Sequence, residues 1–223
     1  MRIAILGGTG DLGKGLVLRW SKKHDIIVGS RFKEKALKMA EEYRAIAKKH
    51  YGDAMLGSIE GEENLKALNR AEVIVPCISH EYILDFAKSL TIREDQVVLS
   101  PITVLEKKGK TFYYRPMSYE GKSLSVSELL VELLKTNRIV TAFQTVSAGK
   151  LADLNSELNY DILICGDDLK AVEQVKGLIE DIKNLKAYYV GGLDLSSLVE
   201  CQTALLINLA IRNKLKDPSL KIV

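Results

Sequence analysis

The chain of 223 residues contains little cysteine and little histidine, three residues of each. The cysteines, Cys77, Cys165 and Cys201, are odd in number and widely spaced. They therefore fit neither a disulfide framework nor a zinc site, and they favour a reducing compartment. Neither H-E-x-x-H nor C-x-x-C occurs, and no Ser–His–Asp pattern is evident. We therefore predict no metal site and no hydrolytic triad.

Long apolar runs are also absent. None approaches the ~20 residues of a membrane-spanning helix, because the longest, 204–211, is interrupted by Asn208. The first six residues are too short for a signal peptide and are followed at once by glycines. We expect them to form the first strand of the fold, and we predict a cytoplasmic protein without a membrane partner.

The chain has no strong excess of charge of either sign. Lys and Arg total 32 against 29 Asp and Glu, a net charge of +3 that gives no sign of a nucleic-acid partner. Hydrophobic residues make up 47% and charged residues 27%, as in ordinary folded proteins, which excludes general disorder. The length suits one large α/β domain, with or without a small appendage.

Apolar runs alternate with amphipathic stretches along most of the chain, the pattern of a mostly parallel sheet covered by helices on both faces. Strands are predicted at 3–6, 26–28, 55–59, 72–77, 96–99 and 139–143, and helices at 12–23, 33–50, 64–70, 82–90 and 125–134. Residues 104–121 show no clear period and are predicted to be irregular. A further strand–helix–strand unit is expected at 161–165, 169–182 and 187–190, before a final apolar helix at 196–212.

A G-x-G-x-x-G motif follows the first predicted strand and opens the first predicted helix; it consists of Gly8, Thr9, Gly10, Asp11, Leu12 and Gly13. This context makes the motif specific for a dinucleotide. The first glycine allows a tight turn, the second lets a pyrophosphate approach the backbone, and the third lets helix and strand pack closely. The alternative is a glycine-rich turn needed for steric reasons alone. We predict a Rossmann-type NAD(P)-binding fold.

The end of the second predicted strand indicates which dinucleotide is bound. An NAD enzyme has Asp or Glu there to bind the ribose 2′-hydroxyl, whereas this chain has Ser30 and Arg31, followed by Lys33 and Lys35. These side chains suit a 2′-phosphate, and Arg31 is also able to stack on the adenine. The alternative is a solvated helix start, but lysines there oppose the helix dipole unless an anion binds. We therefore predict NADP(H).

Several segments resemble one family, the NADPH-dependent reductases of the deazaflavin coenzyme F420 from archaea and actinobacteria. They are GGTGDLGKG at 7–15, GSR at 29–31 and YDILICGDD at 160–168, and the likeness extends to VVLSPITVLEKKGK, QTVSAGKLADL and the tail PSLKIV. The resemblance covers nearly the whole chain. It implies hydride transfer between NADPH and the deazaflavin as co-substrate, in a homodimer.

The resemblance also implies site residues. It assigns Thr9, Gly10, Asp11 and Leu12 to the pyrophosphate, and Ser30, Arg31 and Lys35 to the 2′-phosphate. It places Ile78 and Tyr82 near the nicotinamide ribose, Ser100, Pro101 and Ile102 at the nicotinamide, and Ala148 on the far side of the cleft.

Two segments that border the expected cleft depart from the family pattern. Ser79-His80 stands where members have a proline and an aromatic residue, and Gln144-Thr145 stands where they tend to have His-Thr. These departures leave NADP binding intact and concern the second substrate. His80 is the one candidate for a catalytic side chain, through a hydrogen bond to a ring carbonyl or a phosphate. The alternative is a loop histidine without a role.

The anionic tail of the deazaflavin calls for a basic cleft. Lys108, Lys110, Arg115 and Lys150 are candidates, and a solvated charged loop is the alternative.

The final helix is apolar around much of its circumference, at Leu198, Val199, Ala204, Leu205, Leu206, Leu209, Ala210 and Ile211. We expect it to form a dimer interface, with packing across its own domain as the alternative. We therefore divide the chain into an extended NADP-binding Rossmann domain at 1–190 and a helical segment at 191–223, a candidate dimerisation element.

Two other functions fit parts of this pattern. Imine reductases resembling pyrroline-carboxylate reductase share the NADP-type start, but they need a long C-terminal helical bundle, and residues 191–223 suffice for one helix. A non-catalytic NADP sensor is the second alternative, and its difference from the reductases would lie at Ser79, His80 and Gln144.

Overall fold

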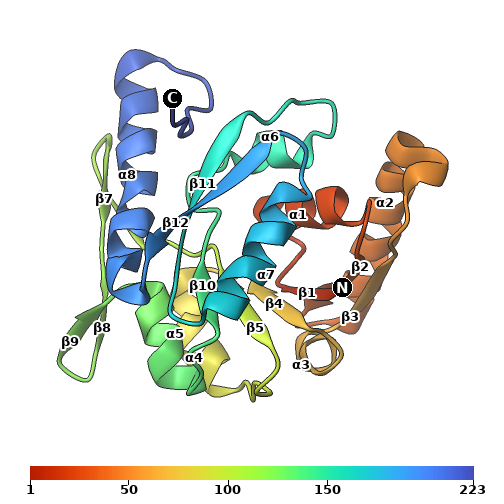
Figure 1. Ribbon diagram of the computed structural model, residues 1–223, viewed down its shortest axis with the longest axis horizontal. Helices are drawn as coiled ribbons and strands as arrows, with labels where there is room; N and C mark the ends of the chain where they lie inside the picture. The colour runs from red at the N-terminus through yellow and green to blue at the C-terminus, as the bar shows by residue number, and fades with distance from the viewer.

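A computed structural model describes all residues 1–223 and contains one eight-stranded sheet between two layers of helices (Figure 1). The strands are β1 (Arg2–Leu6), β2 (Asp25–Ser30), β3 (Ile59–Glu63), β4 (Val73–Pro76), β5 (Val97–Ser100), β10 (Ile139–Thr141), β11 (Tyr160–Gly166) and β12 (Leu185–Gly191). The α-helices are α1 (Asp11–Trp20), α2 (Lys33–Tyr51), α3 (Asn64–Asn69), α4 (Ile83–Lys88), α5 (Val126–Leu134), α6 (Ala148–Ala152), α7 (Leu169–Glu180) and α8 (Ser196–Asn213).

The strand order is β12-β11-β10-β5-β4-β1-β2-β3. From β3 to β10 all neighbours are parallel, β11 is antiparallel to β10, and β12 is parallel to β11. The predicted Rossmann-type fold, extended by a strand–helix–strand unit and a C-terminal helix, is thereby confirmed. The strand order reverses beside β1, and such a reversal opens a crevice at the carboxyl ends of the strands.

The two faces of the sheet are covered because β-strand side chains alternate between them. In β1, Ile3 and Ile5 pack into the core under α1, α2 and α7, whereas Ala4 and Leu6 pack into the core under α3, α4 and α5. All four side chains are fully buried. Strands buried on both faces need continuous apolar runs, as 3–6 showed in the sequence.

Two sequence-based expectations were wrong. The third strand is Ile59–Glu63 rather than 55–59. It is the sheet edge, and only Ile59 of its five residues is buried, so it lacks an apolar run. The segment 104–121 is not irregular but contains the antiparallel hairpin β6 (Leu105–Lys108)–β7 (Thr111–Tyr114) and most of the hairpin β8 (Met117–Tyr119)–β9 (Lys122–Leu124).

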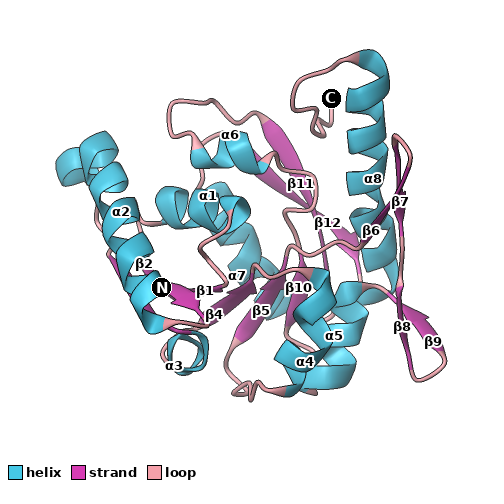
Figure 2. Ribbon diagram, turned by 180° about the vertical axis from the view of Figure 1, so that it is seen from behind, coloured by secondary structure: helices cyan, strands magenta, loops and turns pink.

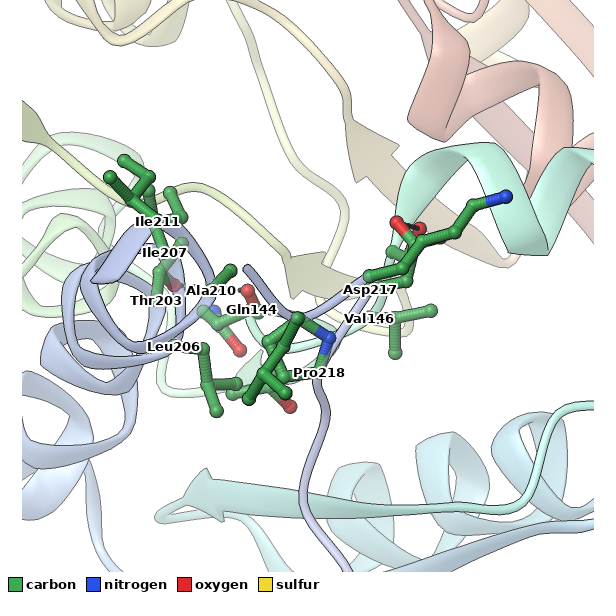
Figure 3. Close-up of a pocket in the computed structure, with 13 residues that line it drawn as sticks. Gln144, Val146, Thr203, Leu206, Ile207, Ala210, Ile211, Asp217 and Pro218 are labelled. Atoms are coloured by element: carbon green, nitrogen blue, oxygen red, sulfur yellow. Dashed lines mark hydrogen bonds between the residues drawn. The ribbon is translucent and has the colours of Figure 1, made fainter. Parts of the chain in front are cut away.

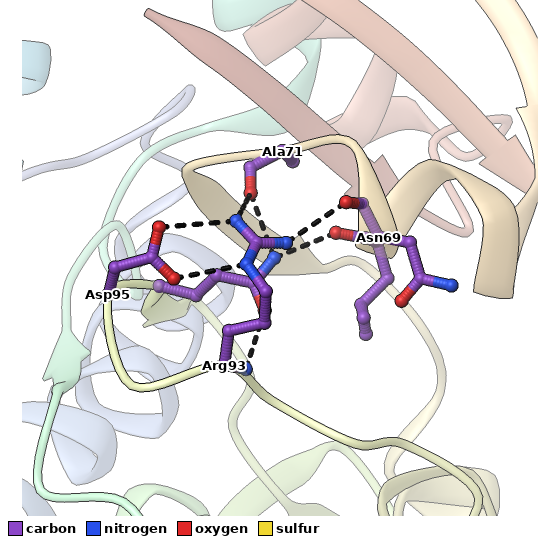
Figure 4. Close-up of polar contacts among 6 residues, drawn as sticks. Asn69, Ala71, Arg93 and Asp95 are labelled. Atoms are coloured by element: carbon purple, nitrogen blue, oxygen red, sulfur yellow. Dashed lines mark hydrogen bonds and ion pairs between the residues drawn. The ribbon is translucent and has the colours of Figure 1, made fainter.

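An arginine fixes the amino ends of β4 and β5 next to each other (Figure 4). Arg93, just before β5, donates to the backbone oxygens of Asn69 and Ala71, at 2.9 and 3.1 Å. It is held in place by an ion pair with Asp95, with 3.0 Å between Nε and Oδ1. This cluster lies at the edge opposite the crevice, so it stabilises the sheet without entering the site.

The helix α8 and the hairpin β6–β7 lie at the end of the molecule opposite α2 (Figures 1 and 2). The segment Leu193–Asn213 has a mean hydropathy of 1.2 and is 28% buried. Its length and composition alone would allow a membrane span, although Glu200 and Asn208 interrupt the apolar run. The core helix of a soluble protein passes the same test, so this is weak evidence for a membrane.

A buried carboxylate on α8 joins three elements. Glu200 is fully buried and accepts hydrogen bonds from the N–H groups of Val126 and Ser127, at 3.2 and 3.3 Å, and from the hydroxyl of Tyr114, at 3.1 Å. It thereby caps α5 and holds β7. Burial raises the pKa of Glu200 to about 7, although the two backbone donors oppose this shift.

This raised pKa predicts a pH-dependent stability. The folded protein keeps the Glu200 proton up to a pH of about 7, whereas an unfolded glutamate releases it near 4.5. The folded state therefore binds more protons in this interval, and the free energy of unfolding falls as pH rises, by up to about 3 kcal/mol. Urea unfolding at pH 4.5 and pH 8 checks this: Glu200→Gln should gain stability relative to the wild type at the higher pH. A difference that is the same at both pH values would contradict it.

Candidate functional site

The loops at the carboxyl ends of β1, β4 and β5 enclose a cavity of about 280 Å³. We call it the glycine-loop cavity. It is lined by Gly10, Asp11, Leu12, Gly13, Pro76, Cys77, Ile78, Ser79, His80, Pro101, Ile102 and Thr103. The structure thus brings together the predicted residues of the glycine motif, of the segment after β4 and of the segment after β5. Gly8 and Thr9 belong to the same loop but do not line this cavity.

The glycine loop has the geometry that a diphosphate needs. A Cβ on Gly13 would lie 2.7 Å from the Cα of Gly8, so helix and loop are in close contact. A Cβ on Gly10 would have no protein atom within 4 Å, so the space beside it is open to a ligand. Gly10 caps α1 without a side-chain hydrogen bond, which leaves the first N–H groups of the helix for an anion.

A side chain that the sequence analysis missed supports this loop. Asn64 at the start of α3 is buried, and its Oδ1 accepts a hydrogen bond of 3.3 Å from the N–H of Gly7. The same oxygen lies 2.6 Å from the position of a Cβ on Gly29 in β2. Asn64 therefore joins the ends of β1 and β2. An asparagine at the start of a polar helix gives no local signal for such a role.

The predicted 2′-phosphate residues lie at the end of β2. Ser30 is buried and its Oγ accepts from the N–H of Phe32 at 3.3 Å, while Arg31 and Lys35 are exposed. Lys33 is engaged with Glu62, with 3.3 Å between Nζ and Oε2. No side chain caps α2, so its N-terminus adds positive potential beside Arg31. The group presents a basic, solvent-open surface.

Tyr82, which the resemblance assigns to the nicotinamide ribose side, lies beside Arg31. Its ring centroid is 5.8 Å from Cζ of Arg31, within the range of a cation–π contact. Tyr82 is the last residue of the short 3-10 helix His80–Tyr82, which follows β4. Tyr82 therefore lies near the predicted 2′-phosphate residues and does not line the glycine-loop cavity, whereas Ile78 and Ile102 do.

A second, larger cavity of about 460 Å³ lies between α8, the loop after β10 and the last residues of the chain (Figure 3). We call it the C-terminal cavity. It is lined by Gln144, Thr145, Val146, Ser147, Thr203, Leu206, Ile207, Ala210, Ile211, Leu215, Lys216, Asp217 and Pro218. Helix α8 contributes its apolar wall, as Figure 3 shows for Leu206, Ile207 and Ala210. Ala148 follows this loop but does not line the cavity.

Two threonines and a glutamine connect the cavities. Thr203, which lines the C-terminal cavity, lies 3.2 Å by its Oγ1 from the Oγ1 of Thr103, which lines the glycine-loop cavity. Thr203 also donates to the Gln144 carbonyl at 2.9 Å, and Gln144 Nε2 donates to the Ser100 carbonyl at 2.8 Å. Near this junction, Ser100 Oγ and Gln144 Oε1 are buried without a hydrogen-bond partner. Buried polar atoms without a partner are rare in folded proteins, and these two lie together at the junction of the cavities.

The backbone just before Gln144 is in a rare conformation. Phe143 has a φ of 74°, in the left-handed region that non-glycine residues seldom adopt. The ring is buried against Trp20 in an edge-to-face contact, with 5.7 Å between centroids. This packing holds the turn that directs Gln144 toward β5. Strained residues of this kind cluster at functional sites.

The site contains no activated nucleophile. Cys77 lines the glycine-loop cavity, but burial raises the pKa of its thiol to about 12, so it stays protonated at neutral pH. His80, the predicted catalytic candidate, is partly exposed and lines the same cavity. No group of three or more acidic, cysteine or histidine side chains is arranged to hold a metal ion. The arrangement suits binding and orientation of two ligands rather than covalent catalysis.

None of the four predicted basic candidates lines either cavity. Lys108 and Arg115 both pair with Glu106 on the hairpin, and Lys150 lies 5.7 Å by its Nζ from the ring centroid of Tyr160. Lys216 lines the C-terminal cavity instead. No motif or periodic pattern selects Lys216, because it follows the last predicted helix.

Comparison with known proteins gives consistent results. Residues 2–103 match the family model described as NADP oxidoreductase, coenzyme F420-dependent. The chain is 37% identical to the F420-dependent NADP reductase of Methanocaldococcus jannaschii, over 100% of this chain and 98% of the relative. It is 32% identical to the protein of that name from Methanothermobacter thermautotrophicus, covering 100% and 94%. A crystal structure from Arthrobacter sp. FB24, of a candidate F420-dependent NADP reductase, shares the fold at TM-score 0.76, 17% identity and coverage of 100% and 99%.

Proposed function

Because this chain belongs to the family of F420-dependent NADP reductases, we propose that it transfers a hydride between NADP(H) and the deazaflavin coenzyme F420. One structural observation supports this proposal independently of family membership. The glycine-loop cavity and the apolar C-terminal cavity meet at the Thr103–Thr203 contact, so two ring systems bound in them would lie next to each other.

The residues present fit NADP(H). The open space at Gly10 and the uncapped N-terminus of α1 suit the pyrophosphate, and Ser30, Arg31 and Lys35 suit the 2′-phosphate. We assign Ile78, Pro101 and Ile102 to the nicotinamide side, and Tyr82 to the adenosine side with Arg31.

The reaction needs little of the protein beyond positioning. When bound, the nicotinamide donates or accepts a hydride and the deazaflavin is its reaction partner. The chain's residues hold the two sites in contact, and Leu206, Ile207 and Ala210 give the second site a wall without hydrogen-bonding groups that keeps water away from the rings. We give His80 the role of a hydrogen-bond donor at the glycine-loop cavity, not that of a base.

Turnover tests this function. The purified protein is mixed with NADPH and oxidised coenzyme F420, and the loss of deazaflavin absorbance is followed. We expect turnover with NADPH and a kcat/KM at least roughly tenfold lower with NADH, because the 2′-phosphate contacts are lost. Tight binding of NADPH without any turnover would instead favour an NADP sensor.

We also propose that residues 191–223 form a dimerisation element occupied by a second copy of this chain. Leu198, Leu205 and Leu209 lie on one face of α8, at spacings of 7 and 4 residues, and are 57, 63 and 42% exposed. Glu200 is the single charged residue between 196 and 211, and it is buried. An uncharged stripe of this kind is complementary to itself in a two-fold dimer.

We therefore expect Leu205→Glu to convert a dimer into monomers, because it places a charge in the interface. Sedimentation velocity at micromolar concentration measures this. Leu37→Glu on α2 is the matched control, since Leu37 is 49% exposed and α2 lies at the end of the molecule opposite α8, and it should remain dimeric. A wild-type monomer, or a Leu205→Glu dimer, would contradict the proposal. Binding of a monomer to lipid vesicles would assign the stripe to a membrane surface.

We propose a cytoplasmic location. All three cysteines are free, and they lie in three different elements or loops without a partner, as expected for a protein of a reducing compartment.

A further inference from the structure

The last ten residues of the chain return from α8 across the loop after β10. The turn begins at Lys214, whose φ of 53° ends the helix, and continues at Asp217, with φ of 51°. Ser147 donates to Asp217 Oδ1 at 2.9 Å, and Ser219 Oγ donates to the Thr145 carbonyl at 3.1 Å. These contacts hold residues 215–218 over the C-terminal cavity, where they form one wall (Figure 3).

Beyond this wall the segment is anchored to one buried carboxylate. Asp161 of β11 is fully buried and accepts from the N–H of Ile222 at 2.6 Å, and its Oδ1 lies 3.0 Å from Nζ of Lys221. The N–H of Asp161 donates to the Leu220 carbonyl at 3.0 Å. Three consecutive residues of the tail are thus bound to a single residue of the sheet.

The topology explains why the tail fits there. β10 pairs with β11 only at Cys165 and Gly166, so the first half of β11 has no strand on that side. The tail takes this place.

Burial alone would raise the pKa of Asp161, but the Ile222 N–H and the Lys221 ammonium lower it below its usual value. The carboxylate therefore stays charged at neutral pH, and a buried ion pair is costly to break from one side.

We propose that Asp161 is a positioning residue for the second substrate: by clamping Lys221 and Ile222 it holds residues 215–218 as a wall of the C-terminal cavity and so sets the affinity for the deazaflavin. Asp161 lines neither cavity, so it acts through the tail. This inference rests on the proposed function, because it takes the C-terminal cavity as the deazaflavin site.

Two variants test the clamp from its two sides. Asp161→Asn keeps the side-chain shape but removes the charge, and Lys221→Met removes the ammonium, whose side chain is 37% exposed. Thermal unfolding of each variant confirms that it is folded at the assay temperature. Asp181→Asn is the matched control, since its carboxylate pairs with Lys23 and His24 away from both cavities. The readouts are amide hydrogen exchange of residues 215–222, the Kd of F420 by its fluorescence, the Kd of NADPH, and the KM and kcat for F420.

In both Asp161→Asn and Lys221→Met we expect faster amide exchange in residues 215–222. The Kd and KM for F420 should each rise about tenfold, because one charge-assisted contact that holds the tail is lost. The Kd of NADPH and the kcat at saturating F420 should stay within about twofold of the wild type, as should every value for Asp181→Asn. Faster exchange with an unchanged Kd for F420 would overturn the inference, and so would unchanged exchange. A wild type that binds no F420 would overturn the proposed function itself.

Discussion

Replacing Gly10 by valine should weaken NADPH binding at least 100-fold while the protein remains folded. The backbone of Gly10 has φ −90° and ψ 172°, which any residue adopts, and no protein atom would lie within 4 Å of a Cβ there. The side chain would instead occupy the open space assigned to the pyrophosphate, so the loss, about 3 kcal/mol, would fall on binding rather than on folding.

Calorimetric titration with NADPH and thermal unfolding measure the two effects separately. Gly177→Ala is the control, because Gly177 in α7 also has open space around it and lies far from the cavities. It should bind NADPH as the wild type does. Gly13→Ala should differ from both by destabilising the fold, since its Cβ would meet Gly8 at 2.7 Å. A Gly10→Val protein that binds NADPH normally would remove the glycine loop from the site.

Replacing Arg31 by alanine should weaken NADPH binding by roughly 10–100-fold and leave NADH binding nearly unchanged. The guanidinium forms no ion pair with the protein, so it is free to bind the 2′-phosphate with a charge-assisted contact of about 1.5–3 kcal/mol. NADH lacks this phosphate and should lose little more than a stacking contact.

The appropriate comparison is with Lys33→Ala, because Lys33 is already paired with Glu62 and should contribute less to phosphate binding. Titrations of both variants with NADPH and with NADH give four dissociation constants. If Arg31→Ala weakened both cofactors equally, the 2′-phosphate assignment would be wrong, and Arg31 would act on the adenine that the two cofactors share.

The sheet and the glycine loop could be predicted because each depends on a short local pattern. The run Ile3–Leu6 predicts a strand buried on both faces, and the spacing of Gly8, Gly10 and Gly13 predicts the turn into α1. The edge strand β3 was misplaced because Glu60, Glu62 and Glu63 give it the polarity of a loop. Acidic residues at a sheet edge oppose pairing with another chain. Because they are polar, this strand contains no apolar run that would identify it in the sequence.

The two hairpins were missed although their turns carry a signal. Gly109 has a φ of 60°, and Glu120 and Gly121 have φ of 48° and 76°. Two-residue turns with positive φ join antiparallel strands, and a glycine between two short β-prone runs indicates them. The strands of 3–4 residues are too short to show an alternating pattern, so periodicity gives no sign of them.

The C-terminal cavity could not have been predicted from the sequence. Its walls come from 144–147, from α8 and from 215–218, and they are joined by contacts between residues far apart in the chain, such as Thr203 with Thr103 and Ser147 with Asp217. A local sequence pattern does not predict contacts between residues that are far apart in the chain. The family resemblance selected Gln144 as a departure but gave no reason to look at Asp161 or at Thr203.

Direct hydride transfer between two adjacent rings is the central claim, and isotope transfer tests it most directly. The protein is incubated in ordinary water with oxidised coenzyme F420 and with NADPH carrying deuterium at one or the other position of nicotinamide C4, and the reduced deazaflavin is analysed by mass spectrometry. We predict one deuterium in the product from one of the two NADPH epimers and none from the other, because a fixed pair of cavities presents one face of the ring. Product without deuterium from both epimers, or no product at all, would contradict the account.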